Sequence, residues 1–207
     1  MIINLAHTKG GVGKTTIAIN LAITIGASIL DLDLQGSSLR FSEIRKTIGL
    51  PDLITYRLTN GFDDEILSIL NQYKDNPSQH LIIDSGGMDN DVIREGLVYS
   101  DIIITPVNIS PVEFYGLEDF NRLLGGEERE SSYVLINGTN KNSKKTLAYA
   151  VDFIKENFPK FKVLNTVINN RVIFKEAFGE GKSVIEFDPK HESGQQILNL
   201  CHELNLI

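Results

Sequence analysis

Residues 9–16 read Lys9-Gly10-Gly11-Val12-Gly13-Lys14-Thr15-Thr16, and they directly follow the short apolar run 2–6. The glycines of this stretch allow backbone conformations that are closed to other residues, so successive N–H groups can converge on one anion. The general phosphate-loop pattern has a glycine where Thr8 stands here, and it does not require a lysine at position 9. The stretch therefore predicts a variant phosphate loop that carries a second cation.

The residue types that complete the loop indicate nucleotide binding. A helix starting near Gly13 would direct its positive N-terminal end at the bound anion. Lys14 is placed to reach the terminal phosphates, and the hydroxyl of Thr15 is placed to ligate Mg²⁺. The alternative is a glycine-rich turn that merely precedes a helix. The order of apolar strand, loop, Lys-Thr pair and amphipathic helix favours the nucleotide site.

The composition is that of one globular domain covering residues 1–207. With 42% hydrophobic and 23% charged residues, the chain is long and apolar enough for a two-sided core. No apolar run is long enough to span a membrane, and no signal peptide precedes the first strand, so we expect a cytoplasmic protein. The single cysteine, Cys201, fits a reducing compartment and is expected in the core.

Charge is unevenly distributed along the chain. The net charge of −7 argues against a protein that coats itself in nucleic acid. Between residues 141 and 175, however, basic residues outnumber Asp152 and Glu156. This segment is either a face for a polyanion such as DNA, bound without sequence preference, or a solvated helix surface. Its basic residues are Lys141, Lys144, Lys145, Lys155, Lys160, Lys162, Arg171 and Lys175.

Short β-branched runs alternate with helical patterns throughout the sequence. Strands are expected at 2–6, 28–32, 80–84, 101–105, 132–136 and 163–168, with a weaker one near 53–58. Helices are expected at 14–26, 36–48, 62–73, 89–99, 113–124, 143–157, 171–178 and 193–204. The strands are almost continuously apolar, as strands buried on both faces are. We therefore predict an α/β fold with a mostly parallel, twisted sheet and helices on both faces.

Two aspartates, Asp31 and Asp33, follow the second expected strand, where ligands of parallel sheets lie. Asp31 is expected to have a structural role. Asp33 is the better candidate for orienting the attacking water or holding a metal-bound water. The alternative is that Asp33 caps the helix expected at 36–48.

Polar residues also follow two later strands. Asp84 ends an apolar strand behind the phosphate loop, which is the usual position of the second Mg²⁺ element. Gly86 and Gly87 then give backbone freedom where a loop responds to the γ-phosphate. Asn137 is placed to read the adenine edge with its amide, or to form a local turn with Gly138.

The motifs at 9–16, 31–36 and 82–87 together resemble those of the deviant Walker ATPases, the ParA/MinD group of phosphate-loop NTPases. Two later stretches, 100–114 and 166–184, are similar to segments of short ParA-type proteins that partition plasmids and chromosomes. The resemblance therefore extends over nearly the whole chain.

The resemblance implies a weak ATPase with ATP or ADP and Mg²⁺ as cofactors, which dimerises face to face when ATP is bound. Lys9 would be a signature lysine that reaches the nucleotide of the other subunit. Lys14 would bind the β- and γ-phosphates, Thr15 would hold Mg²⁺ and Asp33 would act as the catalytic switch. Dimers would bind the nucleoid, and an adaptor of the ParB or small centromere-binding kind would stimulate hydrolysis, so that a plasmid, chromosome origin or other cargo is moved.

Some positions depart from the family pattern. Leu34 stands where a proline is usual, Gly138 stands where many members have an arginine, and Ile173 stands where longer members have a DNA-contacting arginine. Two other functions are alternatives. A membrane-cycling regulator of the MinD kind needs a basic amphipathic C-terminus, and residues 195–207 contain no Lys or Arg. A small metabolic ATP-using enzyme on this scaffold would need an added substrate domain or more thiolates.

Overall fold

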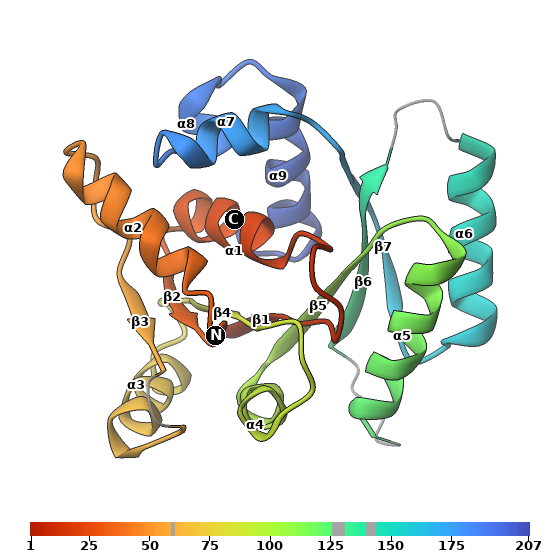
Figure 1. Ribbon diagram of the computed structural model, residues 1–207, viewed down its shortest axis with the longest axis horizontal. Coiled ribbons are helices and arrows are strands. Elements are labelled where there is room, and N and C mark those ends of the chain that lie inside the picture. Colours follow the sequence, from red (N-terminus) through yellow and green to blue (C-terminus); the bar gives the residue numbers. More distant parts are fainter. Residues whose placement is uncertain (59–60, 126–130, 140–143) are drawn as a thin grey trace.

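A seven-stranded sheet runs through the computed structural model, which describes residues 1–58, 61–125, 131–139 and 144–207 (Figure 1). The strands are β1 (Ile2–Leu5), β2 (Ser28–Asp31), β3 (Thr55–Arg57), β4 (Leu81–Asp84), β5 (Ile102–Val107), β6 (Ser132–Thr139) and β7 (Lys162–Asn169). They lie in the order β3-β2-β4-β1-β5-β6-β7, and each neighbouring pair is parallel. The expected α/β fold is confirmed, and the weak strand near 53–58 is the sheet edge β3.

Helices cover both faces of this sheet (Figure 1). They are α1 (Lys14–Ile25), α2 (Ser37–Thr47), α3 (Asp64–Asp75), α4 (Asp91–Tyr99), α5 (Pro111–Leu123), α6 (Lys144–Asn157), α7 (Ile173–Gly179), α8 (Val184–Phe187) and α9 (Glu192–Glu203). Ile3 and Leu5 of β1 contribute to a core with α1, α2 and α7 to α9. Ile2 and Ala6 belong to a second core with α3 to α6. Successive strand residues point to opposite faces, so the continuous apolar runs supply both cores.

The short helix α8 was not expected from the sequence. Ser183 and Glu186 form a capping box at its start, each side chain accepting from the backbone N–H of the other residue. A four-residue helix is too short to show hydrophobic periodicity, which is why no pattern predicted it.

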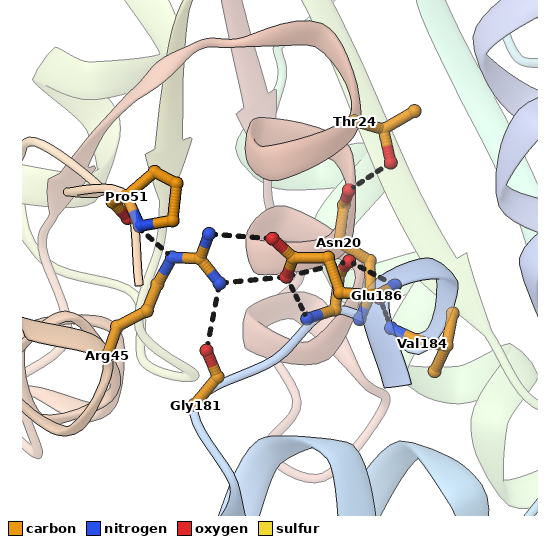
Figure 2. Close-up of polar contacts among 8 residues, drawn as sticks. Asn20, Thr24, Arg45, Pro51, Gly181, Val184 and Glu186 are labelled. Atoms are coloured by element: carbon orange, nitrogen blue, oxygen red, sulfur yellow. Dashed lines mark hydrogen bonds and ion pairs between the residues drawn. The ribbon is translucent and has the colours of Figure 1, made fainter. Parts of the chain in front are cut away.

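The buried guanidinium of Arg45 ties α8 to α2 (Figure 2). It donates two hydrogen bonds of 2.8 Å to the Glu186 carboxylate, and others to the carbonyls of Pro51 and Gly181. Hydrogen bonds from Arg45 and Ser183 hold the pKa of Glu186 below its usual value, although burial acts in the opposite direction.

The same segment is also fixed to α1. The side-chain oxygen of Asn20 accepts a 2.8 Å hydrogen bond from the backbone N–H of Val184, as Figure 2 shows. The C-terminal region therefore braces the helix that follows the phosphate loop.

The order of the strands creates a crevice at the carboxyl edge of the sheet. From β1 the chain crosses through α1 to β2, whereas from the adjacent β4 it crosses through α4 to β5 on the other side of β1. Loops that leave neighbouring strands in opposite directions leave space for a ligand between them. The registers also align the strand ends, because Asp84 is paired with Leu5 on one side and with Asp31 on the other.

Candidate nucleotide site

The loop between β1 and α1 has a shape that requires glycine. Gly11 and Gly13 have φ angles of 78° and 97°, in the left-handed region that side chains disfavour. Gly13 is the N-cap of α1 and makes no side-chain cap. The first N–H groups of α1 therefore remain available to an anion at the helix end. This geometry suits the phosphate loop expected at residues 9–16.

Lys14 supplies the cation inside this loop. It is only 6% exposed, and its Nζ donates to the carbonyl of Lys9 at 2.9 Å. Burial lowers the pKa of Lys14, and the charges of Asp84 and Asp33 oppose that shift. The ammonium thus lies over the loop whose N–H groups favour an anion, as a phosphate-binding lysine requires.

Asp84, at the end of β4, is fully buried beside the first turn of α1. Thr15 Oγ1 donates to one carboxylate oxygen at 3.2 Å, and Ser38 Oγ donates to the other at 2.7 Å. Burial raises the pKa of Asp84 to about 7. A nearby cation would stabilise a carboxylate that has been removed from water. Mg²⁺ binds carboxylate and hydroxyl oxygens together with phosphate oxygens. Thr15 and Asp84 therefore fit the expected metal site.

Sequence reasoning missed Ser38. Its hydroxyl comes from the first turn of α2, which starts at the same edge of the sheet as α1. The available signal was a serine in the first turn of a helix that follows a strand-end aspartate. That signal is weak, because hydroxyl residues are common at helix starts.

The two aspartates after β2 have different surroundings. Asp31 is buried and accepts hydrogen bonds from the backbone N–H groups of Asp33 and Leu39, so it fixes the loop to α2. Burial raises its pKa. Asp33 accepts from the backbone N–H of Gln35, and Gly36 is the N-cap of α2. The alternative in which Asp33 caps that helix is therefore wrong, and its carboxylate lies in the loop at the sheet edge.

The loop after β4 packs directly against its neighbours. A Cβ on Gly87 would lie 2.9 Å from the backbone nitrogen of Gly10, so only glycine permits this contact with the phosphate loop. A Cβ on Gly86 would lie 3.6 Å from the Cα of Asp33. The loop after β4 therefore lies between the phosphate loop and the loop that carries Asp33.

Asn137 lies beside the phosphate loop and makes a contact that neither sequence interpretation anticipated. Its Nδ2 donates to the Val12 carbonyl at 2.6 Å. The residue also lines a cavity of about 230 Å³ that opens between the loop and the carboxyl ends of β6 and β7. Other residues of this cavity are Gly13, Thr16, Asn108, Gly138, Ile168, Asn170, Arg171, Phe174 and Lys175.

The side chain of Lys9 reaches a different partner from that of Lys14. Its Nζ forms a 2.7 Å ion pair with Glu113 in the first turn of α5. Its backbone N–H donates to Nδ1 of His7, whose pKa is lowered to about 3 by burial and by the charges of Lys14 and Lys9. His7 is therefore a neutral, buried support for the loop, and sequence reasoning missed both it and Glu113.

The matching family model is the CobQ/CobB/MinD/ParA nucleotide-binding domain, which covers residues 3–184. The chain belongs to this family. It is 26% identical over 250 residues to the sporulation initiation inhibitor protein Soj of Bacillus subtilis, covering 98% of this chain and 97% of Soj. The predicted resemblance to the ParA/MinD ATPases is thereby confirmed.

Solved structures of this family share the fold. A plasmid partition protein of Borrelia burgdorferi, bound to AMPPNP, has a TM-score of 0.71 at 18% identity over 99% of this chain and 98% of that chain. A chain of the MinC:MinD cell division protein complex of Aquifex aeolicus has a TM-score of 0.76 at 18% identity over 99% of this chain and 95% of that chain.

One departure of this ParA/MinD-family ATPase has a local structural reason. Gly138 has a φ angle of 74°, and a Cβ there would lie 2.4 Å from Oδ1 of Asn108. An arginine at this position would therefore require a different loop. Within the described ranges, no helix combines the length and the hydropathy that crossing a bilayer requires.

The basic segment of this ATPase does not form one continuous face. Lys144 and Lys145 begin α6 at the carboxyl edge of the sheet, and Arg171 and Lys175 follow the carboxyl end of β7. Lys155, Lys160 and Lys162 lie toward the amino edge, because α6 ends there and β7 starts there. The strand β7 separates the two groups by roughly 25 Å. Lys141 lies outside the described residues.

Some of these cations already have partners. Arg171 pairs with Glu192, and Lys160 donates to the Gly125 carbonyl. Lys144 and Lys145 are exposed at the edge that carries the nucleotide site.

Proposed function

We propose that this chain is an ATP-gated dimerising switch that positions a plasmid, a chromosome origin or another cargo on the nucleoid. The observation that carries the proposal is the divergence of two lysines in one loop. Lys14 folds back over its own loop, whereas the Lys9 side chain extends away from the loop to Glu113 on α5. One lysine satisfies the phosphates of the chain's own nucleotide. The second lysine, Lys9, has a role if it contacts the nucleotide that is bound to another copy of the chain.

Nucleotide binding follows from the site geometry. The N–H groups of residues 10–16 and the Lys14 ammonium would hold the phosphates, and Asn137 would keep the loop in position through Val12. The cavity beside Asn137 would take the base, next to the side chain of Phe174. Magnesium, held by Thr15 with Asp84 behind it, would neutralise charge on the phosphates.

Hydrolysis would depend on Asp33. Its carboxylate accepts one hydrogen bond from a backbone N–H and lies beside Gly86. Because it does not cap α2, it can orient a water molecule. We expect slow hydrolysis, because the site of a single chain remains open to solvent until a second copy covers it. Loss of the γ-phosphate would then change the position of Gly87, because Gly87 packs against Gly10 of the phosphate loop.

A second copy has an apolar rim to cover. Leu34 is 80% exposed and Met88 is 62% exposed, and they lie in the loops that follow β2 and β4. A second copy that covered these side chains would remove their apolar surface from water. This supports a face-to-face dimer whose formation depends on the nucleotide.

The dimer would bind DNA without sequence preference, and an adaptor of the ParB or small centromere-binding kind would stimulate hydrolysis. Release and rebinding of the dimer would then move the cargo. Support for DNA binding comes from the exposed Lys144 and Lys145, which lie at the same edge of the sheet as the nucleotide site.

The test compares two lysine variants in sedimentation equilibrium with Mg²⁺ and a non-hydrolysable ATP analogue. Lys14→Ala should lose binding of the analogue, and with it dimerisation. Lys9→Ala should retain binding but lose the dimer. Lys155→Ala, at the far edge of α6, serves as the control and should behave as the unmodified chain. The proposal fails if the unmodified chain stays monomeric with bound analogue, or if Lys9→Ala dimerises normally.

A further inference from the structure

We infer that Glu113 restrains Lys9 within its own chain, so that breaking this ion pair sets the threshold for dimerisation. The inference rests on the proposed function, because it concerns the lysine assigned there to the second copy. Glu113 would act by holding the Lys9 side chain in place, and it lies on α5, outside the nucleotide motifs.

The negative charge of Glu113 is balanced mainly by the ammonium of Lys9. The ion pair is 2.7 Å long, and the side chains of Lys9 and Glu113 are 33% and 14% exposed. The second carboxylate oxygen, Oε2, is buried and has no hydrogen-bond partner among the described residues. A carboxylate so far removed from water is costly unless a cation accompanies it.

Helix α5 is packed closely enough to hold the lysine stem in place. Thr8 Oγ1 donates to the Gly116 carbonyl at 3.2 Å. A Cβ on Gly116 would lie 2.9 Å from Cε1 of His7 and 3.5 Å from Cδ of Lys9. Gly116 and Glu113 are three residues apart and share one helix face. The stem of Lys9 therefore lies against that face, and its ammonium ends at the carboxylate.

The restraint would act on association and leave nucleotide binding by a single chain unaffected. Lys14 faces the loop interior, and its Nζ is held by the Lys9 carbonyl, not by the Lys9 side chain. If Lys9 moves to a phosphate bound by another copy, Glu113 is left buried without its cation. That loss occurs twice in a symmetric dimer, once for each chain. Removing the negative charge at position 113 should consequently favour the dimer.

The experiment measures dimerisation of Glu113→Gln in sedimentation equilibrium, with Mg²⁺ and a non-hydrolysable ATP analogue. The glutamine keeps the size of the side chain and removes its charge. We expect the dimer dissociation constant to fall roughly fivefold to thirtyfold, as two partly buried ion pairs would give. Binding of the analogue to the single chain should change by less than about twofold.

Three further variants separate restraint from a structural effect. Glu118→Gln, five residues later on α5, removes a charge that pairs with Arg122 and should leave dimerisation unchanged. Lys9→Ala with Glu113→Gln should fail to dimerise, as Lys9→Ala does, because the glutamine acts only through the lysine; a double variant that dimerises would show that Glu113 acts independently of Lys9. If Glu113→Gln does not fold, Glu113→Asp retracts the carboxylate by one methylene and should tighten the dimer in the same direction.

The outcomes distinguish this inference from the function on which it rests. If the unmodified chain dimerises with the analogue but Glu113→Gln dimerises equally or more weakly, the restraint is wrong and the proposed function stands. If the unmodified chain does not dimerise at all, both are wrong.

Discussion

Asn137 Nδ2 donates to the backbone carbonyl of Val12 at 2.6 Å, so the carboxyl end of β6 holds the phosphate loop one residue before Gly13. A Cβ on Gly13 would lie 2.3 Å from the same nitrogen. Glycine at position 13 is therefore required both by its φ angle of 97° and by the approach of Asn137. The shape of the loop depends on a residue that is 125 positions away in the sequence.

Asn137→Ala should weaken nucleotide binding by about threefold to tenfold, which corresponds to the loss of one hydrogen bond that orders the loop. Titration calorimetry with an ATP analogue measures this. Asn108→Ala is the control, because Asn108 lines the same cavity without a hydrogen bond to the loop. Equal losses in both variants would indicate that the cavity wall matters, and not the contact with Val12.

Asp84→Asn should stabilise the nucleotide-free protein by roughly 1–2 kcal/mol, because it removes a fully buried charge while keeping the shape. The same change should abolish the Mg²⁺ dependence of nucleotide binding. Chemical denaturation and binding titrations with and without Mg²⁺ test the two effects. Asp152→Asn, on the exposed side of α6, should change neither quantity. A destabilised Asp84→Asn protein would mean that the charge, and not only the shape, supports the free fold.

Arg45→Met should lower the free energy of unfolding by about 3 kcal/mol, because it leaves the Glu186 carboxylate and two backbone carbonyls without their donor. Arg94→Met is a matched control, since Arg94 forms a solvent-exposed ion pair with Asp89 and its loss should leave the free energy of unfolding nearly unchanged. Similar losses in the two variants would contradict the structural role of the Arg45 network.

The same network predicts a pH dependence. The pKa of Glu186 is lowered from its usual 4.5 in the folded chain, so the folded state binds its proton less readily than the unfolded state. The stabilisation is therefore complete above pH 4.5 and is lost as the pH falls through the lower folded value. Urea denaturation between pH 6 and pH 3 should show this loss, and Arg45→Met should show less of it.

Replacing Lys144 and Lys145 together by Ala should weaken ATP-dependent DNA binding and reduce the salt dependence of binding by about one unit of slope for each phosphate contact removed. Filter binding or anisotropy at several salt concentrations measures both. Replacing Lys155 and Lys162, at the other edge of the sheet, should have little effect. DNA affinity that does not change with salt would mean that the basic segment is only a solvated surface.

The sequence alone determined the fold class and the nucleotide motifs, because these are local patterns. Each of these patterns is made of residues that are close together in the sequence. They are the continuous apolar strands, the glycines and Lys14 of the phosphate loop, and the aspartates that end strands. Because the strands are parallel, the two strand-end aspartates, Asp31 and Asp84, lie at the same edge of the sheet, as the sequence predicted. The strand expected near 53–58 was also predicted from its local sequence, and the structure places it at the edge of the sheet as β3.

Only the tertiary structure decided which side chains meet. Glu113 is 104 residues from Lys9, and Glu186 is 141 residues from Arg45. No periodic pattern links such positions, because their contacts result from the packing of helices that are distant in the chain. The same reason explains why the basic segment, continuous in sequence, is divided between two edges of the sheet. A strand carries its two ends to opposite edges, so nearness along the chain does not ensure nearness in space.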